Sequence, residues 1–173
     1  HEFQASFTGS FPALLSRLLN LLHRFGHCIP ANTQEEAPDV SLYDHLRTTC
    51  AIAACLYQRH KHLGTADMET AIRRHDQQDF ILAAGDLSGI QSYIFGIARG
   101  EEGGVARRLR ARSLMVQVFS ELAARALLER LDLPPPCQII TSGGNFYLLL
   151  PNTTEAVAEL EAMARTLESW ALE

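Results

Sequence analysis

Lysine, paired cysteines and long apolar runs are all scarce in this sequence. The only lysine is Lys61, so arginine carries almost all of the basic charge, and its planar side chain suits bidentate contacts to phosphate. The net charge of −5 excludes a general electrostatic attraction to nucleic acid. The four cysteines form no C-x-x-C pair, which excludes the common zinc and thiol-redox motifs. They are Cys28, Cys50, Cys55 and Cys137.

The lack of long apolar runs and of paired cysteines also bears on where in the cell the protein is located. No apolar stretch reaches the roughly 20 residues that a membrane-spanning helix needs, and the first residues lack the basic-then-apolar pattern of a signal peptide. Cys50 and Cys55 lie in an apolar helical run, so we expect them to be buried thiols. Reduced thiols are typical of the cytoplasm, and we therefore expect a cytoplasmic protein without membrane contact.

Residues 1–75 are predicted to be entirely helical. Phe11–Phe25 carries leucines at helical spacing, which predicts an amphipathic helix. Ser41 and Asp44 form an S-x-x-D start, a relative of the capping box, for a second helix. A further short helix is expected over 67–74.

From residue 76 onward, strands and helices are mixed. The predicted elements are a strand at 80–84, a helix from Gly89, a longer helix to about Leu131, strands at 138–141 and 146–150, and a helix opened by Asn152 and Glu155. This order is that of a ferredoxin-like or palm domain, βαββα, whose closing strand is missing, so the fold class is α+β. In the usual sheet order the missing strand pairs with Phe80–Ala84. Its loss exposes an apolar edge, and we therefore interpret the chain as a fragment.

Local patterns predict two further details of the helices. Ser88 and Gln91 form an S-x-x-Q capping box that starts the first of them. The longer helix has an apolar face and a polar face. The apolar set is Met115, Val118, Phe119, Leu122 and Ala126, and the polar set is Gln117, Glu121 and Arg125.

Asp86 is the residue most suggestive of chemistry. It ends the first predicted strand just before a helix, where palm-type nucleotidyl enzymes place a magnesium-binding carboxylate. Two carboxylates are needed because magnesium keeps an octahedral shell while it holds triphosphate oxygens. The second normally comes from the following hairpin, which has no acid here. Asp86 is therefore either part of a degraded metal site or a strand-end residue bonded to local amides.

The predicted turn Ser142–Asn145 contains two glycines in place of acids. Gly143 and Gly144 would let backbone amides approach a ligand closely. Ser142 and Asn145 could hydrogen-bond a phosphate or a ribose. The alternative is a plain two-glycine hairpin turn.

Four arginines crowd the start of the longer helix. They are Arg107, Arg108, Arg110 and Arg112. Positive charge there opposes the helix macrodipole, at roughly 0.3–1 kcal/mol per exposed side chain, which suggests an anionic partner such as RNA or a triphosphate. A solvated face balanced by the two preceding glutamates is the alternative. Ser88 and the amide of Gly89 also suit anion binding, although helix capping explains Ser88 equally well.

The helical part offers one candidate metal pair. Asp44 and His45 are an adjacent acid and imidazole, the combination that binds metal in His-Asp phosphohydrolases. Capping of the helix by Asp44 is the favoured alternative. His23 and His27 are four residues apart and could be neighbours at a helix end.

Several segments resemble the large subunit of type III CRISPR effector complexes. Gly85–Phe95 reads GDLSGIQSYIF and is similar to the motif that opens the first palm domain of that family. The similarity continues through Leu109–Ser113 (LRARS) and Ser142–Leu150 (SGGNFYLLL). Upstream, Ser41–Thr49 (SLYDHLRTT) resembles the end of the family's His-Asp domain. The Csm (III-A) branch fits better than the Cmr branch.

The resemblance implies a domain division and a function. Residues 1–75 would be the C-terminal part of a His-Asp domain and 76–173 the first palm. In that family two palms hold ATP, with Mg²⁺ or Mn²⁺, and make cyclic oligoadenylates when target RNA is bound. The second palm catalyses through a GGDD hairpin, and the first has a degenerate hairpin and helps to hold nucleotide. Other subunits of the complex, guide RNA and target RNA are the implied partners.

The resemblance leaves two functions open. The chain is either a half-site that binds nucleotide only beside a second palm, or a module that binds RNA or a partner subunit without nucleotide chemistry. An RNA-recognition sheet would show basic and aromatic residues, whereas these strands are mostly aliphatic and are expected to be buried. A GGDEF-type cyclase is disfavoured by the acid-free turn. The family's His-Asp domain cuts single-stranded DNA, but its N-terminal ligand pair is not recognisable in this sequence.

Overall fold

The computed structural model describes residues 10–34, 36–65, 69, 73–74, 76–96 and 104–171. The chain divides into two compact units, His1–Thr49 and Cys50–Glu173. The boundary falls inside a single helix, α2 (Leu42–His62). Among the described residues, no helix is both long enough and apolar enough to cross a membrane.

The first unit contains the helix that the leucine pattern predicts and the beginning of a second helix. Helix α1 spans Phe11–Gly26, and α2 begins at Leu42. The Ser41 hydroxyl accepts a hydrogen bond from the backbone N–H of Asp44 at 3.0 Å and donates to the Asp44 carboxylate at 2.7 Å. The predicted S-x-x-D cap is therefore confirmed. The short helix predicted over 67–74 lies largely outside the described residues.

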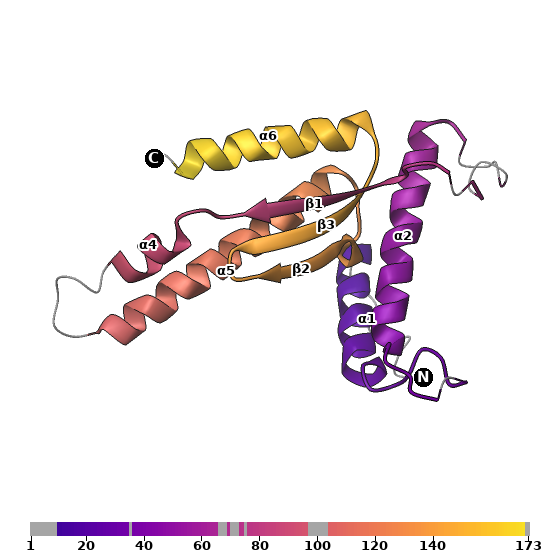
Figure 1. Cartoon of the computed structure of the whole chain (residues 1–173), viewed down its shortest axis with the longest axis horizontal. Coiled ribbons are helices and arrows are strands. Elements are labelled where there is room, and N and C mark those ends of the chain that lie inside the picture. Colours follow the sequence, from indigo (N-terminus) through magenta and orange to yellow (C-terminus); the bar gives the residue numbers. More distant parts are fainter. Residues whose placement is uncertain are drawn as a thin grey trace. The chain divides into compact units, whose positions relative to one another are not determined.

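The second unit is built on an antiparallel sheet. Its strands in the described part of the chain are β1 (Phe80–Asp86), β2 (Gln138–Ser142) and β3 (Asn145–Pro151), in the order β1-β3-β2 (Figure 1). The other elements are α4 (Ile90–Phe95), α5 (Val105–Arg130), the 3₁₀ turn η2 (Pro135–Cys137) and α6 (Thr154–Ala171). This order confirms the α+β class. Strand β1 lies at an edge of the described sheet, on the side where the missing strand was expected.

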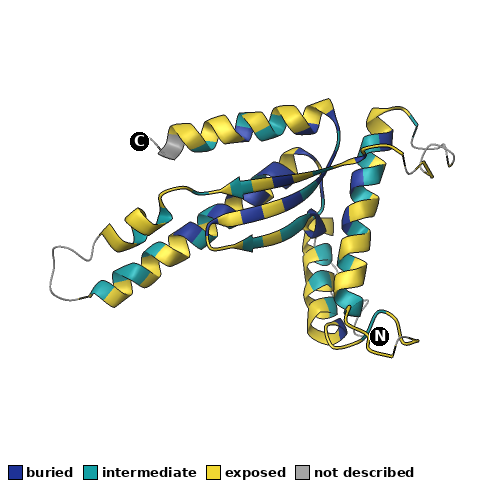
Figure 2. Cartoon of the chain, viewed as in Figure 1, coloured by how far each residue is buried: buried dark blue, intermediate teal, exposed yellow. Residues whose placement is uncertain are grey.

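The two faces of the sheet differ in burial. Directly paired residues of antiparallel strands point to the same face. Phe146, Leu148 and Leu150 of β3 point to an inner face and are 5%, 0% and 0% exposed. They form one core cluster with α5 and α6. Buried and exposed stretches alternate along β3 in Figure 2. The outer face carries Leu82 and Tyr147, which are 66% and 42% exposed. The expectation that these strands are buried is therefore correct for the inner face and wrong for the outer face.

Helix α5 packs on the sheet with a face other than its predicted apolar one. Its buried residues are Val116, Ser120, Ala123, Ala124, Leu127 and Leu128. Met115 and Leu122 of the predicted apolar face are 57% and 60% exposed. Small residues such as Ala124 let the helix approach the sheet closely, and this close approach decides which face is covered.

Two helix starts differ from prediction. The N-cap of α4 is Gly89, with φ of 77° and no side-chain cap, so Ser88 does not form the predicted capping box. At α6 the backbone N–H of Ala156 donates to the Thr153 hydroxyl at 3.1 Å. Asn152, the predicted cap, instead donates its amide to the carbonyl of Gln78 at 2.7 Å. Asn152 thereby ties the end of β3 to the segment before β1.

Two cysteines lie in the core of the second unit. Cys55 and Cys137 are both fully buried, and their sulfurs lie 4.0 Å apart. The Cys55 thiol also donates to the Leu149 carbonyl at 3.3 Å. The hydrogen bond to Cys55 and burial raise the pKa of Cys137 well above its ordinary value, and burial raises the pKa of Cys50. A protonated thiol is a poor nucleophile, so Cys50 and Cys137 are expected to react slowly. Cys55 is fully buried and is therefore inaccessible to reagents in the native chain.

We predict a graded reaction with iodoacetamide. Cys28 is exposed and should be alkylated rapidly in the native chain, whereas Cys55 and Cys137 should react only after denaturation. Peptide mass spectrometry over a time course measures each site separately, and labelling in urea is the control. Equal rates at Cys28 and Cys55 in the native chain would show that the core is not closed as described.

Candidate functional site at the glycine hairpin

Three polar side chains line up across the end of the sheet. Asp86 is the direct partner of Asn145 in the β1–β3 pair, and Ser142 is the partner of Asn145 in the β2–β3 pair. Paired residues share a face, so these three residues form a row on the outer face. All three are exposed. The row contains one carboxylate, one carboxamide and one hydroxyl, which together can donate and accept hydrogen bonds.

The turn beside this row needs both of its glycines. Gly143 and Gly144 have φ of 61° and 98°, as in the two-residue type I′ turns that favour glycine. The backbone N–H of Leu87 donates to the Gly144 carbonyl at 3.1 Å. A Cβ on Gly144 would overlap Ile90 of α4 and would lie 3.3 Å from Val116 of α5. The turn is therefore packed under two helices and is more than a plain connection.

A third glycine holds the end of β1 against the hairpin. Gly85 pairs directly with Phe146, and a Cβ on Gly85 would overlap the Phe146 ring. The ring is buried, with 5% of its residue exposed. Cross-strand cover of a glycine by an aromatic ring is a known way of fixing strand register. This contact fixes the position of Asp86, the next residue along β1.

The backbone amide of Gly143 already has a partner. It donates to the Oε1 atom of Gln117 on α5 at 3.2 Å, and the Gln117 Nε2 atom donates to the Thr141 carbonyl at 3.4 Å. A ligand that used the Gly143 amide would have to displace Gln117. The sequence pattern placed Gln117 on the polar face of its helix, and nothing in that pattern indicated a contact with the turn.

Ser88 and Gly89 follow β1 and are not among the paired strand residues that form the polar row. Ser88 lines a mainly apolar groove of about 300 Å³ on the helix side of the unit. The groove is lined by Leu87, Ile90, Tyr93, Met115, Val116, Phe119 and Leu167 as well as Ser88. Gly89 has nothing within 4 Å of its Cβ position. The strand pairing therefore brings together Asp86, Ser142 and Asn145, whereas Ser88 lies beyond the paired residues of β1.

The arginine cluster at the start of α5 is partly used for packing. Arg112 lies over the Tyr93 ring, with its guanidinium carbon 4.7 Å from the ring centroid, and it also donates to the Tyr93 carbonyl. Arg110 donates to the carbonyl of Ala106 at 3.3 Å. Arg107 is exposed, and Arg108 is half-buried and makes a contact of its own. Arg112 therefore joins α4 to α5, a role that the sequence pattern did not indicate.

The candidate metal residues do not assemble into a cluster. In the described ranges, no three His, Cys, Asp or Glu side chains lie close enough to hold a metal ion. Asp44 is engaged with Ser41 at the start of α2. His23 and His27 are neighbours, with ring centroids 5.5 Å apart, and His23 also packs edge-on against Tyr43 at 4.9 Å.

Asp86 likewise has no second carboxylate beside it in the polar row. A lone carboxylate does not fit the two-metal arrangement that phosphoryl transfer uses. We therefore derive no metal-dependent step from the residues of this chain.

These features define the class of the protein. It is a mixed α+β protein whose antiparallel sheet carries helices on its inner face and a polar row with a glycine turn at one end. Residues 79–173, more than half of the chain, match the family model described as Csm1 subunit domain B. The chain belongs to the Csm1 family.

Individual relatives agree with this family. The Cas10/Csm1 protein of Mycobacterium tuberculosis, a CRISPR system single-strand-specific deoxyribonuclease of subtype III-A, is 36% identical over 167 residues. The matched region covers 92% of this chain and 20% of that protein. Crystal structures of a Csm1–Csm4 cassette with cA4 and with AMPPNP match with TM-scores of 0.69 and 0.70 and identities of 32% and 30%. Each match covers 85% of this chain and 19% of the other. The chain thus spans about a fifth of the length of these relatives.

We predict that Gly85→Ala destabilises the second unit. The added methyl group would overlap the buried Phe146 ring, and overpacking of this kind costs about 1–3 kcal/mol in the free energy of unfolding. Urea unfolding followed by circular dichroism measures the change. Combining it with Phe146→Leu should give a smaller loss than the sum of the two single changes, because the clash is shared.

Gly96→Ala is the matched control for this prediction. Gly96 has φ of −60°, and its Cβ would lie 4.0 Å from Arg112. That substitution should be neutral or stabilising, by about 0.4–1 kcal/mol. Equal destabilisation by both alanine substitutions would contradict the role assigned to the Phe146 ring.

Proposed function

We propose that this chain is the first, non-catalytic palm of a type III-A CRISPR interference subunit, with part of the preceding domain. In this proposal it holds nucleotide for cyclic oligoadenylate synthesis and depends on a second palm for the chemistry. The observation that carries the proposal is the row Asp86–Asn145–Ser142, set on an open sheet face beside a turn without side chains. Such a surface can approach phosphate and ribose closely.

The absence of acids from the turn separates binding from catalysis. Nucleotidyl transfer with two metal ions needs at least two carboxylates at the ions, and the row Asp86–Asn145–Ser142 supplies one. We therefore assign ATP as the ligand and place the catalytic Mg²⁺ or Mn²⁺ with the second palm. Relatives crystallised with AMPPNP and with cA4 support an adenine nucleotide as the ligand class.

The same relatives support one of the proposed partners, Csm4. Csm1 proteins of similar structure have been crystallised with Csm4, and we propose that a Csm4-like subunit, guide RNA and target RNA are the partners of the complete protein. Within this chain, Arg107, Arg108 and Arg110 are the proposed contacts to phosphate. Arg112 is a weaker candidate, because its guanidinium group is held at Tyr93.

The helical part is proposed to belong to the C-terminal end of a His-Asp domain. We place the domain boundary at 75/76, close to the start of the family match at residue 79. The relatives are named as single-strand-specific deoxyribonucleases. Asp44 and His45 remain the proposed metal residues, although Asp44 is engaged in the helix cap. We do not assign nuclease activity to this chain by itself.

A binding module without nucleotide chemistry is the second candidate. The exposed apolar outer face favours it, because Leu82, Ile140 and Tyr147 are 66%, 55% and 42% exposed. Apolar exposure of this kind is typical of a surface that another protein covers. It fits a subunit contact better than RNA, because an RNA platform would add basic residues on the strands.

We predict that the isolated chain does not convert ATP into oligoadenylates or polymer, with either Mg²⁺ or Mn²⁺. One carboxylate at the polar row cannot hold two metal ions in the required geometry. Chromatography of reactions with labelled ATP measures the product, and a complete Csm1 subunit that contains this sequence is the positive control. Sustained conversion of ATP by the isolated chain would contradict the half-site proposal.

We also predict that Asp86→Ala and Ser142→Ala lower oligoadenylate output in the complete subunit. Each change removes one hydrogen-bonding group, so the KM for ATP should rise roughly three- to tenfold per lost hydrogen bond. Steady-state rates at varied ATP concentration give KM and kcat. Thr166→Ala is a control, because its hydroxyl donates within its own helix, to the Ala162 carbonyl at 2.9 Å. Unchanged kinetics in both site variants would favour the binding-module alternative.

A further inference from the structure

Gln117 holds two backbone groups on either side of Ser142. Its Oε1 atom accepts from the Gly143 N–H at 3.2 Å, and its Nε2 atom donates to the Thr141 carbonyl at 3.4 Å. Gln117 lies within α5, which is anchored in the core by Val116 and Ser120, 8% and 0% exposed. A single carboxamide therefore attaches a rigid helix to the chain immediately before and after Ser142.

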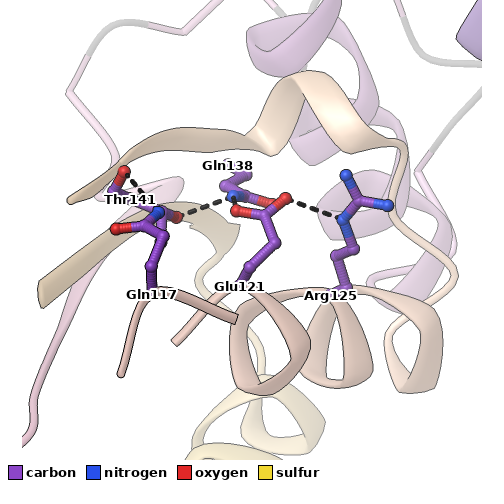
Figure 3. Close-up of polar contacts among 5 residues, drawn as sticks. All are labelled: Gln117, Glu121, Arg125, Gln138 and Thr141. Carbon is purple, nitrogen blue, oxygen red and sulfur yellow. Dashed lines mark hydrogen bonds and ion pairs between the residues drawn. The ribbon is translucent and has the colours of Figure 1, made fainter. Parts of the chain in front are cut away.

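The next turns of α5 continue this attachment (Figure 3). Gln138 donates from Nε2 to the Glu121 carboxylate at 2.6 Å and to the Thr141 hydroxyl at 2.6 Å. The other oxygen of Glu121 accepts from Arg125 at 2.8 Å. The result is a line of polar side chains on α5, spaced four residues apart, that lies over β2. Thr141 is held through its side chain by Gln138 and through its main chain by Gln117.

A bulge in β2 makes this arrangement possible. Gln138 pairs with Leu148 and Ile140 pairs with Tyr147, so one extra residue lies between them. An extra residue reverses the alternation of side chains along a strand. Gln138 and Thr141 therefore both point to the inner face, toward α5. Ser142 points to the outer face, between two backbone groups that Gln117 holds.

We propose that Gln117 is a positioning residue for nucleotide binding at the hairpin, acting from the opposite face of the sheet. It sets the position of Ser142, and through the Ser142–Asn145 pair it sets the rest of the polar row. It does not contact the ligand. The inference rests on the proposed function, because it assumes that the outer row binds nucleotide.

The chemistry of the side chain is specific to glutamine. The two backbone groups are one donor, the N–H of Gly143, and one acceptor, the carbonyl of Thr141. A carboxamide supplies the matching acceptor and donor together. Glutamate at this position keeps the acceptor for Gly143 and loses the donor for Thr141. Methionine has a similar length and supplies neither bond.

The test uses a complete Csm1 subunit that contains this chain, assembled in its complex, with ATP as substrate. Gln117→Met should raise the KM for ATP roughly three- to tenfold, as expected for the loss of one or two hydrogen bonds that position the site. It should leave kcat within about twofold, because catalysis is assigned to another domain. Gln117→Glu should give a smaller rise. Gln58→Met is the matched control, because Gln58 also donates to a main-chain carbonyl, that of Asp132, at 3.2 Å.

A second measurement examines the contact itself. Amide hydrogen exchange at Gly143 in the native chain should be slow in the parent sequence and in Gln117→Glu, and faster in Gln117→Met, because only the last lacks an acceptor for this N–H. The melting temperatures of Gln117→Met and Gln58→Met should agree, so that a general loss of stability does not explain the change in KM.

Each outcome of the kinetic test is decisive. An unchanged KM in Gln117→Met overturns the positioning role and leaves the proposed function standing if Ser142→Ala raises KM. If neither variant alters the kinetics, the nucleotide site at the hairpin and the positioning role both fail. An equal rise in Gln58→Met, or a fall in kcat at constant KM, also overturns the positioning role.

Discussion

Lack of space for a side chain at two glycines fixes the geometry of the hairpin end of the second unit. The Phe146 ring covers Gly85, and Ile90 and Val116 close over Gly144. Because no Cβ fits at either position, the end of β1, the hairpin turn and two helices are held at their closest possible approach. This packing gives the exposed row on the outer face a rigid base, which is what a binding site on a strand end requires.

The bulge in β2 is the second feature that shapes the site. Because of the bulge, both Gln138 and Thr141 point to the inner face toward α5, while Ser142 points to the outer face. Without it, the alternation along β2 would turn Gln138 away from the helix, and Glu121 would lose a partner. The inner network and the outer row are therefore two results of a single irregularity in the sheet.

A surface of this kind can separate binding from chemistry. The exposed row offers a carboxylate, an amide and a hydroxyl, and its turn offers no acid. Binding energy can come from such groups, whereas metal-assisted transfer needs more negative charge around the ions. The exposed apolar face around Leu82 and Ile140 provides surface for another domain or subunit. In the proposed function, these two properties allow the chain to support a reaction that it does not itself catalyse.

Local signals in the sequence predicted most of the elements correctly. The leucine stripe predicted α1, Ser41 and Asp44 predicted the start of α2, and the two glycines predicted the turn between β2 and β3. Local signals failed at the starts of two helices. Ser88 and Asn152 both matched capping patterns, but a glycine and a neighbouring threonine provide the caps.

The sequence by itself determined the element order, the α+β class, the acid-free turn and the family, because each depends on residues that are close together along the chain. Only the tertiary structure decided which face of α5 is buried. It also decided that Asp86 pairs with Asn145 and that Gln117 accepts a hydrogen bond from the Gly143 N–H in the turn. Those outcomes depend on the register of three strands and on one bulged residue. A shift of one residue in the pairing of a strand moves each of its side chains to the opposite face of the sheet, and no local sequence pattern predicts that register.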